Sequence, residues 1–277
     1  MNLHLAFSSC PNDTFMFDAW VHKRFPVSPH QLQLHIADIE ELNQLALSGI
    51  PDVVKISYAL YPQLRSHYQL LTAGSALGYG SGPLVVSRHK LYPDELSHAV
   101  IAIPGEHTTA ALLLRVLFPE VNRLPVYLFS DIEEVVLSGE ADAGVLIHET
   151  RFTYQKKGLQ KVVDLGFLWE ETTSLPVPLG AIAVRRSLPS EVKRSLNLCM
   201  RNSVAFALEN REASRSFVQQ YAREMDNEVC KNHINLYVNE FSVDLGDLGK
   251  KAVAALLGKV LLPETDQDPS LPIFVSY

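Results

Sequence analysis

The sequence lacks the features that mark several large classes of protein. Its 277 residues include three cysteines, Cys10, Cys199 and Cys230, which are widely spaced and form no C-x-x-C pair. Neither a disulfide framework nor a zinc site is therefore indicated. No apolar run approaches the roughly 18 residues that cross a bilayer, and MNLHLAF has neither the basic start nor the apolar segment of a secretory signal. We expect a cytoplasmic protein in a reducing compartment, without membrane insertion.

Positive charge is also scarce. The formal net charge is −7, and no Lys/Arg-rich run with interleaved aromatic residues occurs, so neither nucleic acid nor an anionic membrane is an expected partner. The motifs H-E-x-x-H and G-x-S-x-G are absent, as is a G-x-G-x-x-G between a strand and a helix. We therefore expect no metal and no cofactor. The sequence leaves the oligomeric state open.

One alternative is an exported lipoprotein. The stretch FSSC loosely resembles the run of small residues before a lipid-modified cysteine. Only nine residues precede Cys10, which is too short for the apolar segment that export requires. We therefore favour a protein that is not exported.

The chain does have clear α/β periodicity. Apolar residues alternate over 3–7 and 32–36, as in strands. Between them, Asn12, Asp13 and Thr14 are residues that can cap a helix start, and Phe25-Pro26 marks its end. A helix over 38–47 precedes the buried strand DVVKIS. This order predicts a parallel sheet with helices on both faces. Later helices are predicted over 190–209, 212–224, 228–239 and 248–259.

An internal echo indicates two similar lobes. DIEELNQLALSGIPDVVKIS, at 38–57, is answered by DIEEVVLSGEADAGVLIH, at 131–148, with the same opening, the same Leu-Ser-Gly exit, an Asp and a buried strand. Further strands are predicted at AVIAIP and VYLF. The glycine-rich stretch 74–88 forms either a hinge or a tight turn, and VPLGAIAVRR, at 177–186, returns to the first lobe. We predict lobe A at 1–86 and 182–277, and lobe B at 87–181.

Such a fold places its ligand in the cleft between the lobes, at the carboxyl ends of the strands. Two of the stretches that follow strands begin helices, whose N–H groups can bind an anion. In SSCPNDTF the polar residues form either such a site or a simple cap, and Cys10 is either an activated thiol or a packed one. In IPGEHTTAALLL, Thr108 and Thr109 can donate two hydroxyls to one anion, although the stretch is not a Walker loop.

Two other stretches place reactive side chains at strand ends. Lys55 interrupts the apolar strand DVVKIS, and an unpaired buried ammonium is costly. It therefore either faces an anionic ligand in the cleft, which we favour, or pairs with a carboxylate. His148 ends the strand that echoes DVVKIS, and it is either a general base or a structural histidine.

These stretches carry a family resemblance. SSCPNDTFMF resembles the signature S-x-C-P-N-D-T-F of a menaquinone-biosynthesis family that includes the 1,4-dihydroxy-6-naphthoate synthases and, more distantly, the chorismate dehydratases. KISY, GSALGYGSGPLVVS, GEHTTAALLL, DAGVLIHE and YVNEFSVDLG resemble the naphthoate synthase branch, in the family's order and over nearly the whole chain. The resemblance implies an α/β, two-lobed fold like that of type II periplasmic binding proteins, with a central cleft.

The resemblance also implies a function. Enzymes of the naphthoate synthase branch are lyases that convert cyclic dehypoxanthinyl futalosine, a small anionic substrate, to 1,4-dihydroxy-6-naphthoate and dihydroxyacetone. His148 corresponds to the proposed proton acceptor. The residues that correspond to substrate-binding segments are Lys55, Ile56, Ser57, Thr108 and Thr109.

Asn12 and Thr14 are expected to shape the same cleft. The opening is Ser-Ser-Cys where many relatives have Ser-Pro-Cys, which puts the local loop geometry in doubt. A chorismate dehydratase-like sister enzyme is one alternative, and DAGVLIHE argues against it. A non-catalytic solute-binding protein is another, and it would normally require export.

Overall fold

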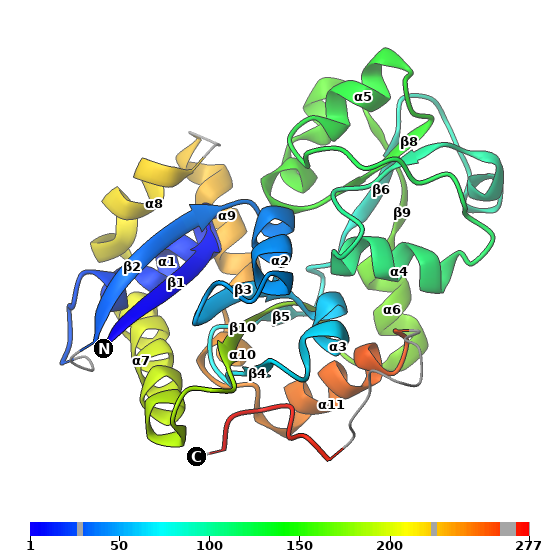
Figure 1. Ribbon diagram of the computed structural model, residues 1–277. Coiled ribbons are helices and arrows are strands. Elements are labelled where there is room, and N and C mark those ends of the chain that lie inside the picture. Colours follow the sequence, from blue (N-terminus) through cyan, green and yellow to red (C-terminus); the bar gives the residue numbers. More distant parts are fainter. Residues whose placement is uncertain (27–29, 223–225, 261–269, 277) are drawn as a thin grey trace. The chain divides into compact units, whose positions relative to one another are not determined.

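The computed structural model describes residues 1–26, 30–222, 226–260 and 270–276, and the chain divides into two compact units (Figure 1). Unit 1 comprises Met1–Gly78 and Pro178–Tyr277, and unit 2 comprises Tyr79–Val177. The predicted boundary after residue 86 would cut through strand β6 (Leu84–Ser87), which lies wholly within unit 2.

The described strands of unit 1 form a six-stranded mixed sheet. Their order is β2-β1-β3-β10-β4, with β5 paired to β10. The strands are β1 (Asn2–Ser8), β2 (Gln31–Ala37), β3 (Val53–Ser57), β4 (Tyr68–Leu70), β5 (Ala76–Gly78) and β10 (Val177–Arg185). β1 runs parallel to β2 and β3, whereas β10 runs antiparallel to β3 and β4. The predicted parallel arrangement is confirmed for β1, β2 and β3, whereas β10, which the chain reaches only after the whole of unit 2, adds an antiparallel strand to the sheet.

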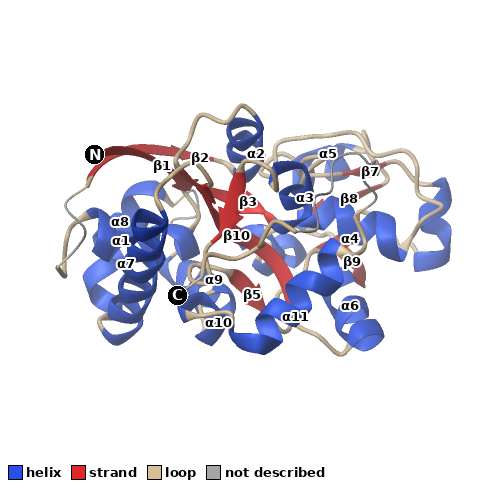
Figure 2. Cartoon of the chain, turned by 60° about the horizontal axis from the view of Figure 1, so that its bottom comes forward, coloured by secondary structure: helices blue, strands red, loops and turns tan. Residues whose placement is uncertain are grey.

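Helices cover this sheet, as the cartoon shows (Figure 2). They are α1 (Pro11–Val21), α2 (Ile39–Leu47), α3 (Tyr61–Leu64), α7 (Ser190–Glu209), α8 (Arg215–Tyr221), α9 (Asn227–Tyr237), α10 (Glu240–Val243) and α11 (Gly246–Leu257), with 3₁₀ turns η1 (Tyr58–Leu60) and η5 (Arg211–Ser214). The predicted helices after residue 190 correspond to α7, η5 with α8, α9, and α11; residues 223 and 224 lie outside the described residues.

Helix α1 lies inside unit 1, with every residue from Pro11 to Trp20 buried. Its apolar side chains join those of β1, α7 and α8 in one core, in which the rings of Phe7 and Phe17 stack 4.4 Å apart. A helix buried on all sides needs no polar face, which explains the run FMFDAW. The first turn of α1 is therefore held within the core of unit 1.

The start of α1 differs from the prediction. Cys10 is the N-cap residue and makes no side-chain capping bond, while Pro11 occupies the first helical position. Proline suits that position because its missing N–H would have no helical partner there. Asn12, Asp13 and Thr14 thus lie within the first turn, and their polar groups serve contacts other than capping.

Unit 2 contains a smaller mixed sheet. Its described strands have the order β7-β8-β6-β9, and β7 and β8 alone among them are parallel. These strands are β7 (Ile101–Ala102), β8 (Ala143–Leu146), β6 and β9 (Gln160–Asp164). The helical segments are η2 (Pro93–His98), α4 (Thr109–Leu117), α5 (Ile132–Ser138), η3 (His148–Phe152), η4 (Tyr154–Lys157) and α6 (Leu165–Thr173).

The strand predicted at VYLF is wrong. Val126 makes an isolated bridge with Ile103, and no named strand forms there among the described residues. Pro125 accepts a hydrogen bond from the N–H of Ile103, and the N–H of Tyr127 donates to the Ile103 carbonyl, but Pro125 has no N–H with which to continue the pairing. A proline therefore prevents this pairing from extending into a ladder.

The internal echo corresponds to two helix–strand units, α2–β3 in unit 1 and α5–β8 in unit 2. Each helix is followed by a glycine with positive φ, Gly49 at +70° and Gly139 at +85°. Glycine ends a helix there because it adopts the left-handed conformation without a Cβ clash. The repeated Leu-Ser-Gly therefore encodes the same helix exit in both units.

Candidate functional site

The predicted site residues fall into two groups. Asn12, Thr14, Lys55, Ile56 and Ser57 belong to unit 1, and Thr108, Thr109 and His148 belong to unit 2. That the two groups share one cleft stays a prediction.

Lys55 projects from β3 and pairs with Asp13 of α1. The Lys55 Nζ lies 2.9 Å from Asp13 Oδ1, and the two side chains are only 5% and 2% exposed. Lys55 Nζ also donates to the carbonyl of Gly74 at 3.4 Å. Of the two interpretations of this lysine, the pairing with a carboxylate is thus the one observed, because an ammonium buried without a counter-ion is costly.

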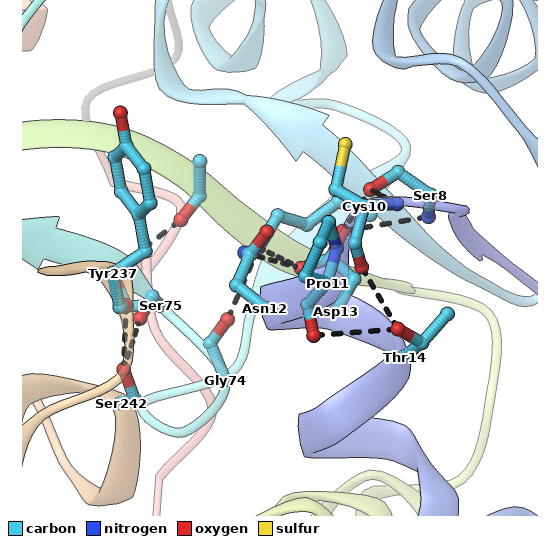
Figure 3. Close-up of polar contacts among 12 residues, drawn as sticks. Ser8, Cys10, Pro11, Asn12, Asp13, Thr14, Gly74, Ser75, Tyr237 and Ser242 are labelled. Carbon is cyan, nitrogen blue, oxygen red and sulfur yellow. Dashed lines mark hydrogen bonds and ion pairs between the residues drawn. The ribbon is translucent and has the colours of Figure 1, made fainter. Parts of the chain in front are cut away.

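The Asp13 carboxylate is the centre of a buried network at the first turn of α1 (Figure 3). Its Oδ2 accepts the hydroxyl proton of Ser8 at 2.6 Å, and its Oδ1 accepts from Asn12 Nδ2 at 3.0 Å. The backbone N–H of Cys10 in turn donates to Ser8 Oγ at 3.3 Å. The signature S-x-C-P-N-D thus builds a carboxylate site, which the sequence interpretation missed because it treated Asp13 as a cap.

Glycine at position 180 makes room for Lys55. Gly180 in β10 pairs with Ser57 of β3, and a Cβ built on it would lie 2.9 Å from Lys55 Cε. Such a contact is closer than real Cβ atoms tolerate. The lysine and this glycine therefore form a matched pair, which only the sheet pairing reveals.

Thr14 uses its hydroxyl within its own helix. Its Oγ1 donates to the carbonyl of Cys10 at 3.0 Å and approaches that of Pro11 at 3.3 Å, and the residue is fully buried. Such back-bonding is common for threonine in a helix. In this conformation Thr14 stabilises the first turn of α1, and its predicted contact with substrate stays a prediction.

Ser57 and Ile56 are fixed by neighbouring elements. Ser57 exchanges two bonds with Asn43 of α2: its N–H donates to Asn43 Oδ1 at 2.9 Å, and Asn43 Nδ2 donates to Ser57 Oγ at 3.1 Å. Ile56 is fully buried and pairs with Ala181 of β10. Asn43 is a second residue that sequence reasoning missed. The available signal was its position four residues after Ile39 and three before Ala46, on the predicted apolar face of the helix, where a polar side chain needs a partner.

The late motif YVNEFS braces the start of the glycine-rich stretch. Ser242 Oγ donates to the carbonyl of Ser75 at 2.8 Å (Figure 3). Asn239 Nδ2 donates to the carbonyl of Leu77 at 2.9 Å. Ser75 Oγ contacts the hydroxyl of Tyr58 at 2.8 Å, and burial raises the pKa of Tyr58. The segment that supplies the Gly74 carbonyl to Lys55 is thus held in place by α10.

Thr108 and Thr109 lie at the start of α4 in unit 2. Thr108 is the N-cap: its Oγ1 accepts from the N–H of Ala111 at 3.2 Å and donates to the carbonyl of Gly105 at 2.8 Å. Both threonines are 3% exposed. The stretch that was predicted to bind an anion therefore includes a true helix cap, and the positive end of the α4 dipole lies at these two residues.

His148 lies two residues after the end of β8 and begins the turn η3, so it stands at the end of the strand, as predicted. Its φ of +57° is unusual for a residue with a side chain, and such backbone strain is concentrated at functional positions. Its imidazole packs edge-on against the ring of Phe129, with centroids 4.9 Å apart. The ring is thus oriented by an aromatic neighbour within unit 2.

Charged residues surround the turn that begins with His148. Glu149 is 8% exposed, and its Oε2 has no hydrogen-bond partner among the described residues. Arg151 Nη2 lies 3.8 Å from Asp164 Oδ2. Burial raises the pKa of Glu170, and the N–H of Gly80, which donates to Glu170 Oε1 at 2.7 Å, partly offsets that rise. The turn that carries His148 is thus part of a polar region that also includes the start of unit 2.

A separate cavity of about 210 Å³ lies in unit 1 between α1, η5, α8 and α9. Phe15 contributes to its lining, and none of the predicted site residues does. No group of three or more His, Cys, Asp or Glu side chains in the described ranges is arranged to hold a metal ion. The helices within those ranges include none long and apolar enough to cross a bilayer.

The architecture is that of a known class. A ligand-binding component of an ABC-type import system from Staphylococcus aureus superposes with a TM-score of 0.68, at 12% identity, over 98% of this chain and 97% of that chain. At this identity the similarity concerns the fold alone. The protein has the α/β, two-lobed fold of periplasmic binding proteins, which confirms the predicted fold class.

The family is shown by closer relatives. Residues 3–260 match the family described as menaquinone biosynthesis. A 1,4-dihydroxy-6-naphthoate synthase of Thermus thermophilus is 45% identical over 274 residues, 99% of each chain. One of Streptomyces coelicolor is 45% identical over 260 residues, 92% of this chain and 91% of that one. The chain belongs to the menaquinone biosynthesis family, and the naphthoate synthase branch is favoured over the sister-enzyme and solute-binding alternatives.

Proposed function

We propose that the protein is a carbon–carbon lyase that converts cyclic dehypoxanthinyl futalosine to 1,4-dihydroxy-6-naphthoate and dihydroxyacetone. The observation that carries the proposal is the 45% identity to a 1,4-dihydroxy-6-naphthoate synthase over 99% of both chains. Because fold alone does not establish function, the site residues must support it too. The buried Asp13–Lys55 pair and the strained His148 turn are the features that do so.

His148 is assigned the role of general base. A neutral imidazole can remove a proton from the sugar-derived part of the substrate, which starts the cleavage of a carbon–carbon bond. Formation of the aromatic dihydroxynaphthalene ring then drives the cleavage. The edge-on contact with Phe129 restricts the orientation of the ring, which is what a positioned base requires.

The carboxylate of the substrate is assigned to one of several alternative donors. Lys55 and Ser57 in unit 1, and the start of α4 at Thr108 and Thr109 in unit 2, are the candidate groups. A protein with a net charge of −7 needs local donors to retain an anion. We also propose a cytoplasmic location, since the named relatives are biosynthetic enzymes.

The test is to incubate the purified protein with cyclic dehypoxanthinyl futalosine and to detect 1,4-dihydroxy-6-naphthoate by mass spectrometry. We expect turnover by the wild type and a loss of about 10²- to 10⁴-fold in kcat for His148→Ala, the usual contribution of a general base. The affinity for the naphthoate product and the melting temperature should change little. His98→Ala is the matched control, because His98 is an exposed histidine of the same unit.

Two results would contradict the proposal. Nearly wild-type turnover by His148→Ala would remove the assignment of the base. Tight binding of substrate by the wild type without product would indicate a binding protein or a sister enzyme, and chorismate would then be the next compound to test.

A further inference from the structure

The ammonium of Lys55 has one more hydrogen-bond donor than there are acceptors around it. It has three N–H donors, and two acceptors contact it: Asp13 Oδ1 at 2.9 Å and the Gly74 carbonyl at 3.4 Å. No third acceptor for Nζ occurs among the described residues. A buried polar group normally satisfies its hydrogen-bonding capacity, so the remaining donor indicates a position for an acceptor that the protein does not supply.

The carboxylate of Asp13, in contrast, is fully used. Oδ1 contacts Lys55 and Asn12, and Oδ2 contacts the hydroxyl of Ser8 at 2.6 Å and its N–H at 3.4 Å. Asp13 is almost fully buried. Such a carboxylate cannot rotate without losing several bonds at once, so it is a rigid anchor for the lysine.

Four elements fix this arrangement. Ser8 ends β1, Asp13 lies in the first turn of α1, Lys55 lies on β3, and Gly180 of β10 leaves the space that the lysine stem occupies. A buried ion pair is weak evidence for stability, because well-packed apolar residues usually serve as well or better. A construction this specific therefore calls for a role other than stability.

We propose that Asp13 is a positioning residue: it holds the Lys55 ammonium so that the third N–H is presented to the carboxylate of the substrate. The inference rests on the proposed function, which supplies the carboxylate. Because Asp13 balances the charge of Lys55, the pair acts as a directed hydrogen-bond donor rather than as a net positive charge. Asp13 itself touches no substrate and acts through Lys55.

The experiment compares two ligands that differ in the carboxylate. Affinities for 1,4-dihydroxy-6-naphthoate and for 1,4-dihydroxynaphthalene are measured by calorimetry for the wild type, Asp13→Asn, Lys55→Met and the double variant. We expect Asp13→Asn and Lys55→Met each to weaken naphthoate binding by about tenfold, the effect of one hydrogen bond, and dihydroxynaphthalene binding by less than about twofold. The double variant should lose no more than Lys55→Met alone, because Asp13 acts only through Lys55.

The double variant and one further variant, Ser8→Ala, separate positioning from folding. Asp13→Asn leaves a buried ammonium without its counter-ion and is expected to lower the melting temperature, whereas the double variant, which removes both charges, should recover it. Ser8→Ala keeps the ion pair and so should fold. We expect it to weaken naphthoate binding about threefold, with dihydroxynaphthalene binding unchanged, since it frees one oxygen of the anchor.

Asp18→Asn is the matched control. Asp18 is a fully buried carboxylate on the same helix, and it pairs with Arg24 at 2.8 Å, with His22 at 2.8 Å and with Ser214. It should lose stability without any change in the ratio of the two affinities.

The outcomes are distinct. Wild-type naphthoate affinity in both Asp13→Asn and Ser8→Ala, or additive losses in the double variant, would overturn the inference while turnover by the wild type left the proposed function intact. A wild type that neither binds naphthoate nor forms it would overturn the proposed function and this inference with it.

Discussion

Gly180 is the residue on which the position of the Lys55 side chain depends. The lysine is tied to Asp13 at its far end and to β3 at its near end, so its stem cannot move aside freely. An unpaired lysine could move away from a methyl group added at position 180, but Lys55 can move only if its ion pair with Asp13 breaks. A larger residue at position 180 is therefore not accommodated by a simple movement of the neighbouring long side chain.

Gly180→Ala is expected to destabilise the protein by about 1–3 kcal/mol, the usual cost of overpacking, and to lower kcat/KM with it. Urea unfolding and steady-state kinetics measure the two effects. Gly258→Ala is the control, because a Cβ there would meet its nearest atom at 3.5 Å, an ordinary contact, and its stability should change by less than about 0.5 kcal/mol. Wild-type stability in Gly180→Ala would show that the lysine can move without cost.

At the scale of elements, the two helix–strand echoes share more than their order. Asp52 donates its N–H to the carbonyl of His4 at 3.0 Å and accepts the N–H of His4 on Oδ2 at 2.9 Å. Asp142 makes the same pair of bonds with Val100, at 2.9 Å and 2.7 Å. The aspartate before each strand thus ties that strand to its parallel neighbour, which gives the repeated Asp a structural reason.

Both Asp52→Ala and Asp142→Ala should destabilise the protein, and Asp52→Ala should have the larger effect. Asp52 is partly buried and also lies 3.6 Å from Arg185, so we expect about 1–3 kcal/mol for it and about 0.5–1.5 kcal/mol for the exposed Asp142. Urea unfolding provides the measurement, with the exposed Asp94→Ala as the control. Equal effects, or none at either position, would contradict this account.

Glu170 of helix α6 is a titratable group that accepts a hydrogen bond from Gly80, near the start of unit 2. Burial holds the pKa of Glu170 above its ordinary value of 4.5. The folded state then binds more protons than the unfolded state between 4.5 and the raised value, so stability falls as the pH rises through that window. Glu170→Gln cannot ionise and keeps an oxygen for the N–H of Gly80.

The prediction is that the wild type loses stability relative to Glu170→Gln as the pH is raised from below 4.5 towards neutrality. Urea unfolding is followed by the fluorescence of Trp169, the neighbouring residue, with Trp20→Phe as the background in both proteins. Two parallel stability curves would show that Glu170 does not titrate differently in the folded state.

At the scale of the whole molecule, the two units differ in how the chain builds them. Unit 2 is one continuous segment with its own sheet and its own apolar cluster. Unit 1 combines two segments, and β10 lies between β3 and β4 in its sheet. The first segment by itself therefore lacks β10, the strand that joins β3 to β4.

Expressed alone, residues 79–177 are expected to fold, and residues 1–78 are not. A segment of about 100 residues can bury enough surface for independent stability, whereas the first segment would leave β3 and β4 without their shared partner. Dispersed amide resonances and a cooperative urea transition measure folding. Dispersed spectra from 1–78, or a collapsed spectrum from 79–177, would contradict the expectation.

The sequence by itself determined several of the elements, the fold class and the family. Period-two and period-3.6 patterns come from neighbouring residues, so the strands at 3–7 and 53–57 and the helices at 38–47 and 190–209 were predictable. The motif order pointed to menaquinone biosynthesis, as the relatives show. These features depend on local chemistry, which the order of residues records directly.

Only the tertiary structure decided which groups meet. The partner of Lys55, the space left by Gly180, the antiparallel placement of β10 and the bonds between Asn43 and Ser57 all join residues that are distant in the chain. A single sequence shows that Lys55 needs a partner, because a buried charge is costly, but several carboxylates would satisfy that need. The sheet and the first turn of α1 select Asp13, since these elements fix both side chains within bonding distance.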